Sequence, residues 1–146
     1  MNKIYFLLIT FFSISCFAQE EMNVIDESPE VLSVRTVDVP PTSNDCLGRD
    51  KKEKSNCFDE KMLQHIRKHF KYPNRAAEDD IQGKVIVSFI IDEKGKVIDI
   101  ETIGGHKILQ KEAYRIISLL PKFTPAKKEG KSVKIKYSIP INFKLR

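Results

Sequence analysis

Two alternating apolar runs joined by a glycine-containing turn constrain the fold of this chain most. Residues 84–91 alternate between two faces with the two-residue period of a β-strand. Four branched or aromatic side chains share one face: Val85, Val87, Phe89 and Ile91. Residues 92–95 read as a turn that ends in Gly95, where a positive φ is favourable, and residues 96–103 read as the return strand. The pattern predicts an antiparallel hairpin.

Helical patterns lie on both sides of the hairpin. Apolar residues recur every four positions over residues 56–70, and Ser55 or Asn56 suits the start of that helix. Pro73 is typical of the first turn of a helix, so residues 73–80 predict a second, short one. Residues 108–120 predict a third, amphipathic helix that Pro121 ends.

The end of the chain predicts one more strand. Residues 123–130 read as a loop, and residues 133–145 then alternate without a break. The order helix, strand, strand, helix, strand indicates an α+β fold, with a small antiparallel sheet of about three strands and helices packed on one face.

The first 18 residues have the composition of an export signal. Lys3 precedes an apolar run, and Cys16 and Ala18 before Gln19 resemble a signal-peptidase site. The apolar segment is shorter than the roughly 20 residues of a membrane helix. We expect a signal peptide over residues 1–18 and a periplasmic product. An uncleaved inner-membrane anchor that faces the periplasm, or lipid attachment at Cys16, are the alternatives.

Charge and cysteine content divide the remainder into two parts. Residues 19–45 carry seven acids and one base and read as an acidic extended linker, whereas residues 46–146 carry 23 bases and 13 acids and read as the folded domain. Export to an oxidising compartment favours a disulfide between the two cysteines that remain, Cys46 and Cys57. Two free thiols are the alternative.

The segment from about residue 57 to 146 resembles the TonB C-terminal domain family, in its Bacteroidetes-type periplasmic form. The stretches that carry the resemblance are residues 72–76, 83–91, 95–97, 112–115, 123–126 and 139–145. The resemblance implies a protein-binding module linked to energy-coupled transmembrane transport. Its implied partner is the TonB-box peptide of a TonB-dependent outer-membrane transporter, which the last strand binds by strand addition.

The resemblance also implies site residues. The expected peptide-binding edge consists of Val133, Lys134, Ile135, Lys136, Tyr137, Ser138 and Ile139. A second contact region is expected at His69, Tyr72 and Pro73, where His69 stands in place of the Gln of better-known members. Pro140 cannot donate a backbone hydrogen bond, so it suits an edge strand. An edge blunted by Pro140 and by lysines is the structural alternative.

Other functions have weaker support. His65 and His69 lie four residues apart on the first helix, a spacing that suits two metal ligands, so a metal-binding protein is one alternative. A membrane-anchored short energy transducer is another, and a homodimer through the same edge is a third. No phosphate loop, nucleophile elbow or plausible Cys–His pair is present, so we expect no enzyme activity, no cofactor, no small-molecule substrate and no nucleic-acid binding.

Overall fold

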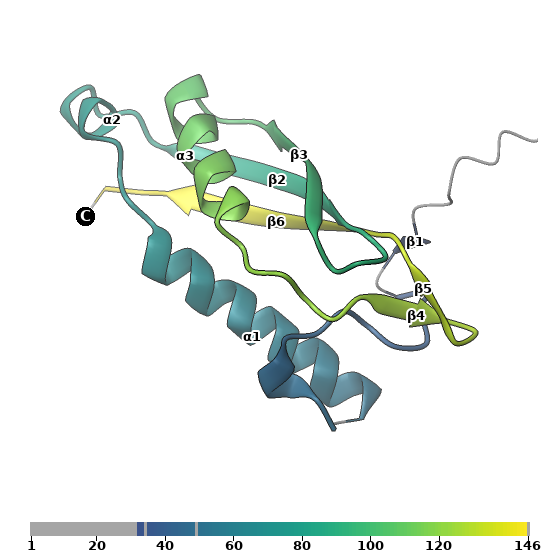
Figure 1. The fold of residues 1–146 in the computed structure, drawn as a ribbon. Coiled ribbons are helices and arrows are strands. Elements are labelled where there is room, and N and C mark those ends of the chain that lie inside the picture. The colour runs from purple at the N-terminus through teal and green to yellow at the C-terminus, as the bar shows by residue number, and fades with distance from the viewer. Residues whose placement is uncertain (1–31, 34, 49, 146) are drawn as a thin grey trace, which may run out of the picture.

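The computed structural model describes residues 32–33, 35–48 and 50–145 and contains a four-stranded sheet with helices packed against it (Figure 1). In chain order the elements are β1 (Leu32–Ser33), η1 (Asn44–Cys46), α1 (Lys51–His69), α2 (Asn74–Glu78), β2 (Gly83–Ile91), β3 (Val97–Ile103), α3 (Lys107–Ser118), β4 (Ala126–Lys128), β5 (Lys131–Val133) and β6 (Ile135–Phe143). The expected signal peptide and the first part of the expected linker lie outside the described residues.

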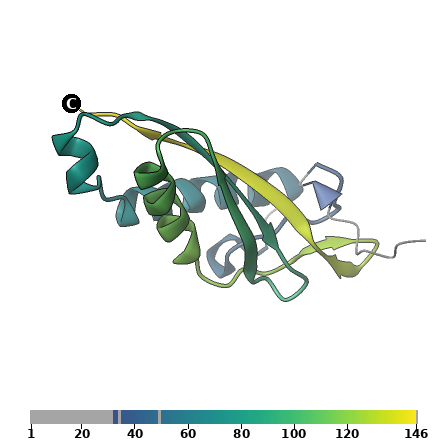
Figure 2. The ribbon, with the colours of Figure 1, turned by 90° about the horizontal axis from the view of Figure 1, so that it is seen from above.

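The sheet has the strand order β1-β6-β2-β3. β2 pairs antiparallel with both β3 and β6, and the three long strands run side by side with a marked twist (Figure 2). β1 pairs parallel with the start of β6, and β4 and β5 form a separate two-stranded hairpin. The expected α+β class and the expected β2–β3 hairpin are confirmed. β1 lies in the segment expected to be an extended linker, and the β4–β5 hairpin was not expected.

One face of the sheet forms the core. Along β2 the side chains of Val85, Val87, Phe89 and Ile91 are fully buried, as the alternation predicted. The amphipathic pattern of α3 is also confirmed, because its buried residues are Leu109, Ala113, Ile116 and Ile117. α1 contributes Phe58 and Met62 to the same cluster. The open face carries the alternate residues of the strands, which are mostly polar or partly exposed.

Three expectations about boundaries are wrong. α1 begins at Lys51, because the Asp50 carboxylate accepts a hydrogen bond from the Glu53 amide at 2.8 Å and so caps the helix five residues before Ser55. The expected continuous strand over residues 133–145 is two strands, since the chain leaves the β4–β5 hairpin at Lys134 before it joins the main sheet. The expected loop over residues 123–130 contains β4, which pairs with β5.

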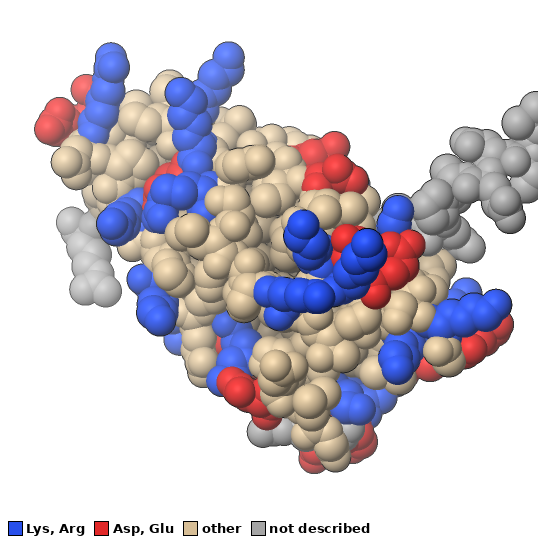
Figure 3. Space-filling model, viewed as in Figure 1, with Lys and Arg blue, Asp and Glu red and all other residues tan. Residues whose placement is uncertain are grey.

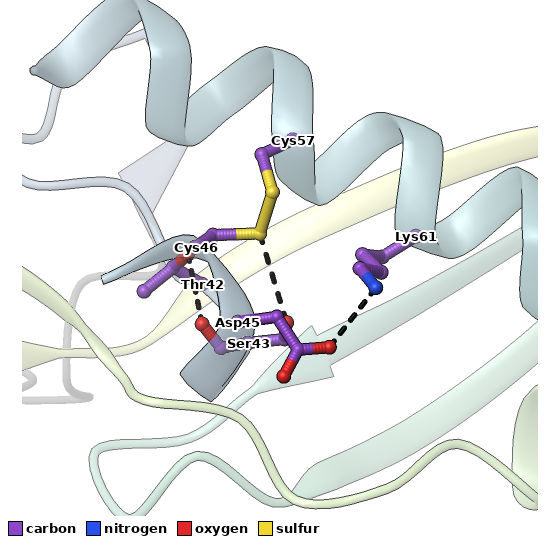
Figure 4. Close-up of a disulfide and its surroundings, with 6 residues drawn as sticks. All are labelled: Thr42, Ser43, Asp45, Cys46, Cys57 and Lys61. Carbon is purple, nitrogen blue, oxygen red and sulfur yellow. Dashed lines mark hydrogen bonds and ion pairs between the residues drawn. A yellow bond between two sulfur atoms is a disulfide. The ribbon is translucent and has the colours of Figure 1, made fainter. Parts of the chain in front are cut away.

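The chain before α1 packs on the domain from β1 onward. Val37 is fully buried, and isolated bridges join Val39 to Lys127 and Thr42 to Thr124. Cys46 then forms a disulfide with Cys57 of α1, with a Cα–Cα distance of 6.0 Å (Figure 4). The disulfide expected from the cysteine count is therefore present, and it fixes this segment to the first half of α1.

Candidate peptide-binding edge

The outer edge of β6 is the candidate site. β2 pairs with β6 along its full length, from Ile91↔Ile135 to Gly83↔Phe143. On the other side β1 covers only Ile135 and Lys136. Within the described part of the chain, the outer edge of β6 has no strand partner beyond Lys136.

The direction of the backbone groups along this edge follows from one hydrogen bond. The Leu32 amide donates to the Lys134 carbonyl at 3.1 Å, so the carbonyl of an even-numbered residue points toward β1. Because backbone groups alternate sides along a strand, the N–H and C=O of Ser138 and Asn142 also point outward. The odd-numbered residues point their backbone groups to β2.

Pro140 lies at an outward-facing position. Its missing N–H therefore removes no hydrogen bond to β2, which explains why a proline is tolerated in a strand with a full-length neighbour. The free edge offers five backbone groups from three residues: both groups of Ser138, both of Asn142 and the Pro140 carbonyl.

A shallow apolar groove lies beside this edge. It is a hollow of about 220 Å³, and its lining comes from the facing sides of α1 and β6: Asp59, Met62, Leu63, Tyr137, Ser138 and Ile139. Leu63 is 49% exposed although it is a large apolar residue in the middle of a helix. An extended segment added to β6 would place alternate side chains over this groove and cover Leu63.

Tyr137 lines the groove, and several contacts hold its side chain in place. Its ring packs edge-on against Phe58, with ring centres 5.2 Å apart, and lies 5.8 Å from Phe89. Its hydroxyl donates a hydrogen bond to the Asp59 carboxylate. Burial, followed by this hydrogen bond to an ionised acceptor, raises the pKa of the Tyr137 hydroxyl above its usual range. The Tyr137–Asp59 pair therefore joins α1 to β6 next to the groove.

The structure separates the residues expected to form the edge into three groups. Val133 belongs to β5 and Lys134 lies between β5 and β6. Ile135 and Lys136 are already paired with β1. Tyr137, Ser138 and Ile139 line the groove at the start of the free edge.

Sequence reasoning missed the α1 side of the groove, because Asp59, Met62 and Leu63 were read only as part of a helix. The peptide was expected along the last strand, residues 133–145, although the residues named for its edge stopped at Ile139. The signal for Leu63 was available, because it widens the apolar stripe of α1 beyond what the core covers.

The expected second contact region is divided between the far end of β6 and α3. Tyr72 packs against Phe143 with ring centres 6.0 Å apart, and its hydroxyl donates to the Ile81 carbonyl at 2.7 Å. Pro73 precedes α2 as its N-cap residue. The His69 ring stacks on His65, whose Nε2 is 2.9 Å from the Ile116 carbonyl. His69 therefore lies on the α3 side of α1, away from the groove.

An ion pair holds the end of α1 against α3. The Arg115 guanidinium contacts Glu112 at 2.6 Å and also donates to the His69 carbonyl at 2.6 Å, while the Glu112 carboxylate accepts from the Lys71 amide at 3.0 Å. The pKa of His69 is lowered, first by desolvation and then by the charges of its neighbours. The Arg115 guanidinium, paired with Glu112, thus caps the C-terminus of α1.

Metal and membrane features are absent from the part of the chain that the structure describes. No group of three or more His, Cys, Asp or Glu side chains lies close enough together there to hold a metal ion. No helix among residues 32–33, 35–48 and 50–145 is long and apolar enough to cross a bilayer. On the face that Figure 3 shows, basic side chains form several separate groups with acidic ones among them.

Comparisons with known proteins found one matching family and similar solved structures. Residues 68–145 match the family described as Gram-negative bacterial TonB protein C-terminal. The chain is also similar to two NMR solution structures of the Helicobacter pylori TonB C-terminal domain. The structure of residues 179–285 is 25% identical, with 72% of this chain and 95% of that chain covered and a TM-score of 0.49. The structure of residues 194–285 is 30% identical, with 60% and 92% covered and a TM-score of 0.44.

No curated protein sequence matches the chain. The family match covers more than half of the 146 residues and includes every element from α2 to β6. The chain belongs to the TonB C-terminal domain family.

Proposed function

We propose that this protein binds an extended peptide of a TonB-dependent outer-membrane transporter by adding it as a strand to the free edge of β6. The observation that carries the proposal is the edge at Ser138, Pro140 and Asn142, which no described strand pairs with, beside an apolar groove. Strand addition uses backbone hydrogen bonds for affinity and alternate side-chain positions for preference. Both features occur together here.

Membership of the TonB C-terminal family supports the wider role. A member of this family takes part in TonB-like energy transduction, so we assign the protein to transport coupling in the periplasm and to binding rather than catalysis. The expected signal peptide over residues 1–18 supports the same compartment. We place Tyr72 and Pro73 of the second contact region at the end of the bound peptide, because Tyr72 packs on the last residue of β6, and we leave out His69, whose ring lies on the α3 side of α1.

The test compares two leucines of equal exposure. Leu63 lines the groove and is 49% exposed, whereas Leu119 lies at the end of α3 and is 48% exposed. A synthetic peptide that copies the N-terminal segment of a TonB-dependent transporter is titrated into the protein, and its dissociation constant is measured by calorimetry. Leu63→Asp should weaken binding about tenfold or more, since a charge replaces apolar contact area. Leu119→Asp should leave the affinity unchanged.

Amide chemical shifts provide the second measurement. Peptide binding should move the amide signals of Ser138 and Asn142, because these N–H groups face the free edge. If saturating peptide leaves both signals in place, strand addition at β6 is wrong. If the same signals move with protein concentration in the absence of peptide, the edge pairs with a second copy of the chain instead.

A further inference from the structure

The chain's own β1 occupies the start of the proposed peptide-binding edge. Leu32 and Ser33 pair in parallel with Ile135 and Lys136, and the Leu32 amide donates a hydrogen bond to the Lys134 carbonyl. β1 is therefore already an added strand at this edge, formed by the segment that precedes the domain.

The side chain of Leu32 gives this pairing its register. Leu32 is 8% exposed and belongs to the same core cluster as Ile135. Its neighbour Ser33 is exposed, since alternate residues of a strand point to opposite faces. A shift of β1 by one residue would expose Leu32 and bury Ser33, so the burial of Leu32 selects one register.

β1 is attached to the domain by fewer contacts than the segment that follows it. β1 has two residues, and the chain turns immediately after it, with the Thr36 amide bonded to the Ser33 carbonyl at 3.1 Å. By contrast, Val37 is fully buried and Val39 has a backbone partner in β4. Release of β1 from the edge would therefore leave the contacts of Val37 and Val39 intact.

We propose that β1 is an intramolecular competitor for the peptide-binding edge, so that the partner strand must displace residues 32 and 33 to use the full length of β6. This inference rests on the proposed function for its partner. With β1 in place, the partner reaches only the edge beyond Lys136. Without β1, the partner gains the Lys134 carbonyl and the backbone groups of Lys136, which face the same side.

The affinity of the whole chain for a long peptide is then reduced by the fraction of molecules in which β1 is bound. Release of β1 exposes one buried leucine and breaks the hydrogen bond to Lys134, which is enough to reduce the apparent affinity on the order of tenfold. A peptide short enough to pair only beyond Lys136 escapes this effect.

A matched pair of variants tests the proposal. Leu32→Asp places a charge at the buried position of β1, and Ser33→Asp places the same charge at the exposed position next to it. Both proteins are full chains exported to a Gram-negative periplasm and purified from it. Hydrogen exchange of the Ile139 and Ile141 amides, which face β2, reports whether the main sheet is intact in each variant.

Two probes separate the inference from the proposed function. The first is a synthetic peptide that copies residues 30–36 of this chain, and the second is the long transporter peptide. Leu32→Asp should bind the first peptide at least tenfold more tightly than wild type or Ser33→Asp does, because only there is the edge vacant. It should also bind the transporter peptide on the order of tenfold more tightly than Ser33→Asp does.

Each outcome decides one point. If the three proteins bind the transporter peptide equally and none prefers the residue 30–36 peptide, β1 is not a competitor, although the proposed function stands. If Leu32→Asp captures the residue 30–36 peptide but no protein binds the transporter peptide, β1 occupies the edge as inferred and the proposed function fails.

Discussion

Replacement of Pro140 by alanine tests the orientation of the whole edge. If the Pro140 position faces outward, Pro140→Ala adds one N–H to the free edge and leaves the pairing with β2 unchanged. Loss of the proline's restraint on the unfolded chain should lower the free energy of unfolding by only about 0.4–1 kcal/mol. A bound peptide would gain one hydrogen bond, worth about 0.5–1.5 kcal/mol, or roughly two- to twelvefold in affinity.

Two further prolines serve as controls for this experiment. Asn142→Pro removes an outward-facing N–H, so it should preserve the fold and weaken peptide binding by a similar factor. Ile141→Pro removes an N–H that faces Val85 of β2 and shortens a buried side chain, so it should destabilise the protein by about 2–5 kcal/mol. Affinity is measured by calorimetry and stability by urea unfolding. The assigned orientation would be refuted if Pro140→Ala bound the peptide less tightly than wild type does. It would also be refuted if Ile141→Pro and Asn142→Pro lowered the free energy of unfolding equally.

Three other predictions concern the stability of the domain. Reduction of the Cys46–Cys57 disulfide, which has a sequence separation of 11, should lower the free energy of unfolding by about 3 kcal/mol in urea titrations with and without reductant; an unchanged midpoint would contradict this. Gly95→Ala should cost about 2 kcal/mol or more in thermal unfolding, because φ is +80° and a Cβ would lie 1.7 Å from the Phe123 carbonyl oxygen. The Tyr137 hydroxyl keeps its proton to a higher pH in the folded state than in the unfolded state, because its pKa is raised on folding. Its contribution to the free energy of unfolding is therefore fully present below about pH 10 and is lost as the pH rises above that value. Tyr137→Phe should make the free energy of unfolding less dependent on pH in this alkaline range, as measured by urea unfolding at several pH values.

Local periodicity predicted the elements that bury one continuous face. The β2–β3 hairpin and α3 each carry enough apolar residues at one period to identify both the element and its buried side. The turn at Gly95 was equally predictable, since its conformation suits few other residues. For these elements the sequence pattern and the tertiary environment favour the same structure.

Periodicity does not report which sheet a strand joins. The alternation continues through Val133 and Ile135, so residues 133–145 read as one strand, yet the chain changes sheets at Lys134. β1 has only two residues and depends on a partner a hundred residues away, so it has no period of its own. The start of α1 was misplaced because its first turns lie outside the core and carry no apolar stripe before Cys57.

In the candidate groove, too, one side was predictable from the sequence pattern and the other was not. Its β6 side follows from alternation together with the family resemblance, and Tyr137, Ser138 and Ile139 were identified in this way. Its α1 side depends on the angle at which α1 crosses β6, which no local pattern contains. Leu63 therefore looked like an ordinary member of an apolar stripe until its 49% exposure distinguished it from Met62, which is 2% exposed.

The disulfide also determines how the domain bears mechanical tension. A pulling force that reaches Cys46 along the preceding chain passes through the sulfur–sulfur bond to Cys57, so residues 47–56 carry none of it. The first turns of α1, which contribute little to the core, are thereby shielded from unravelling under load. The force instead enters α1 at Cys57 and Phe58, where the helix is anchored in the core, and spreads from there to Phe123 and Tyr137 through aromatic contacts.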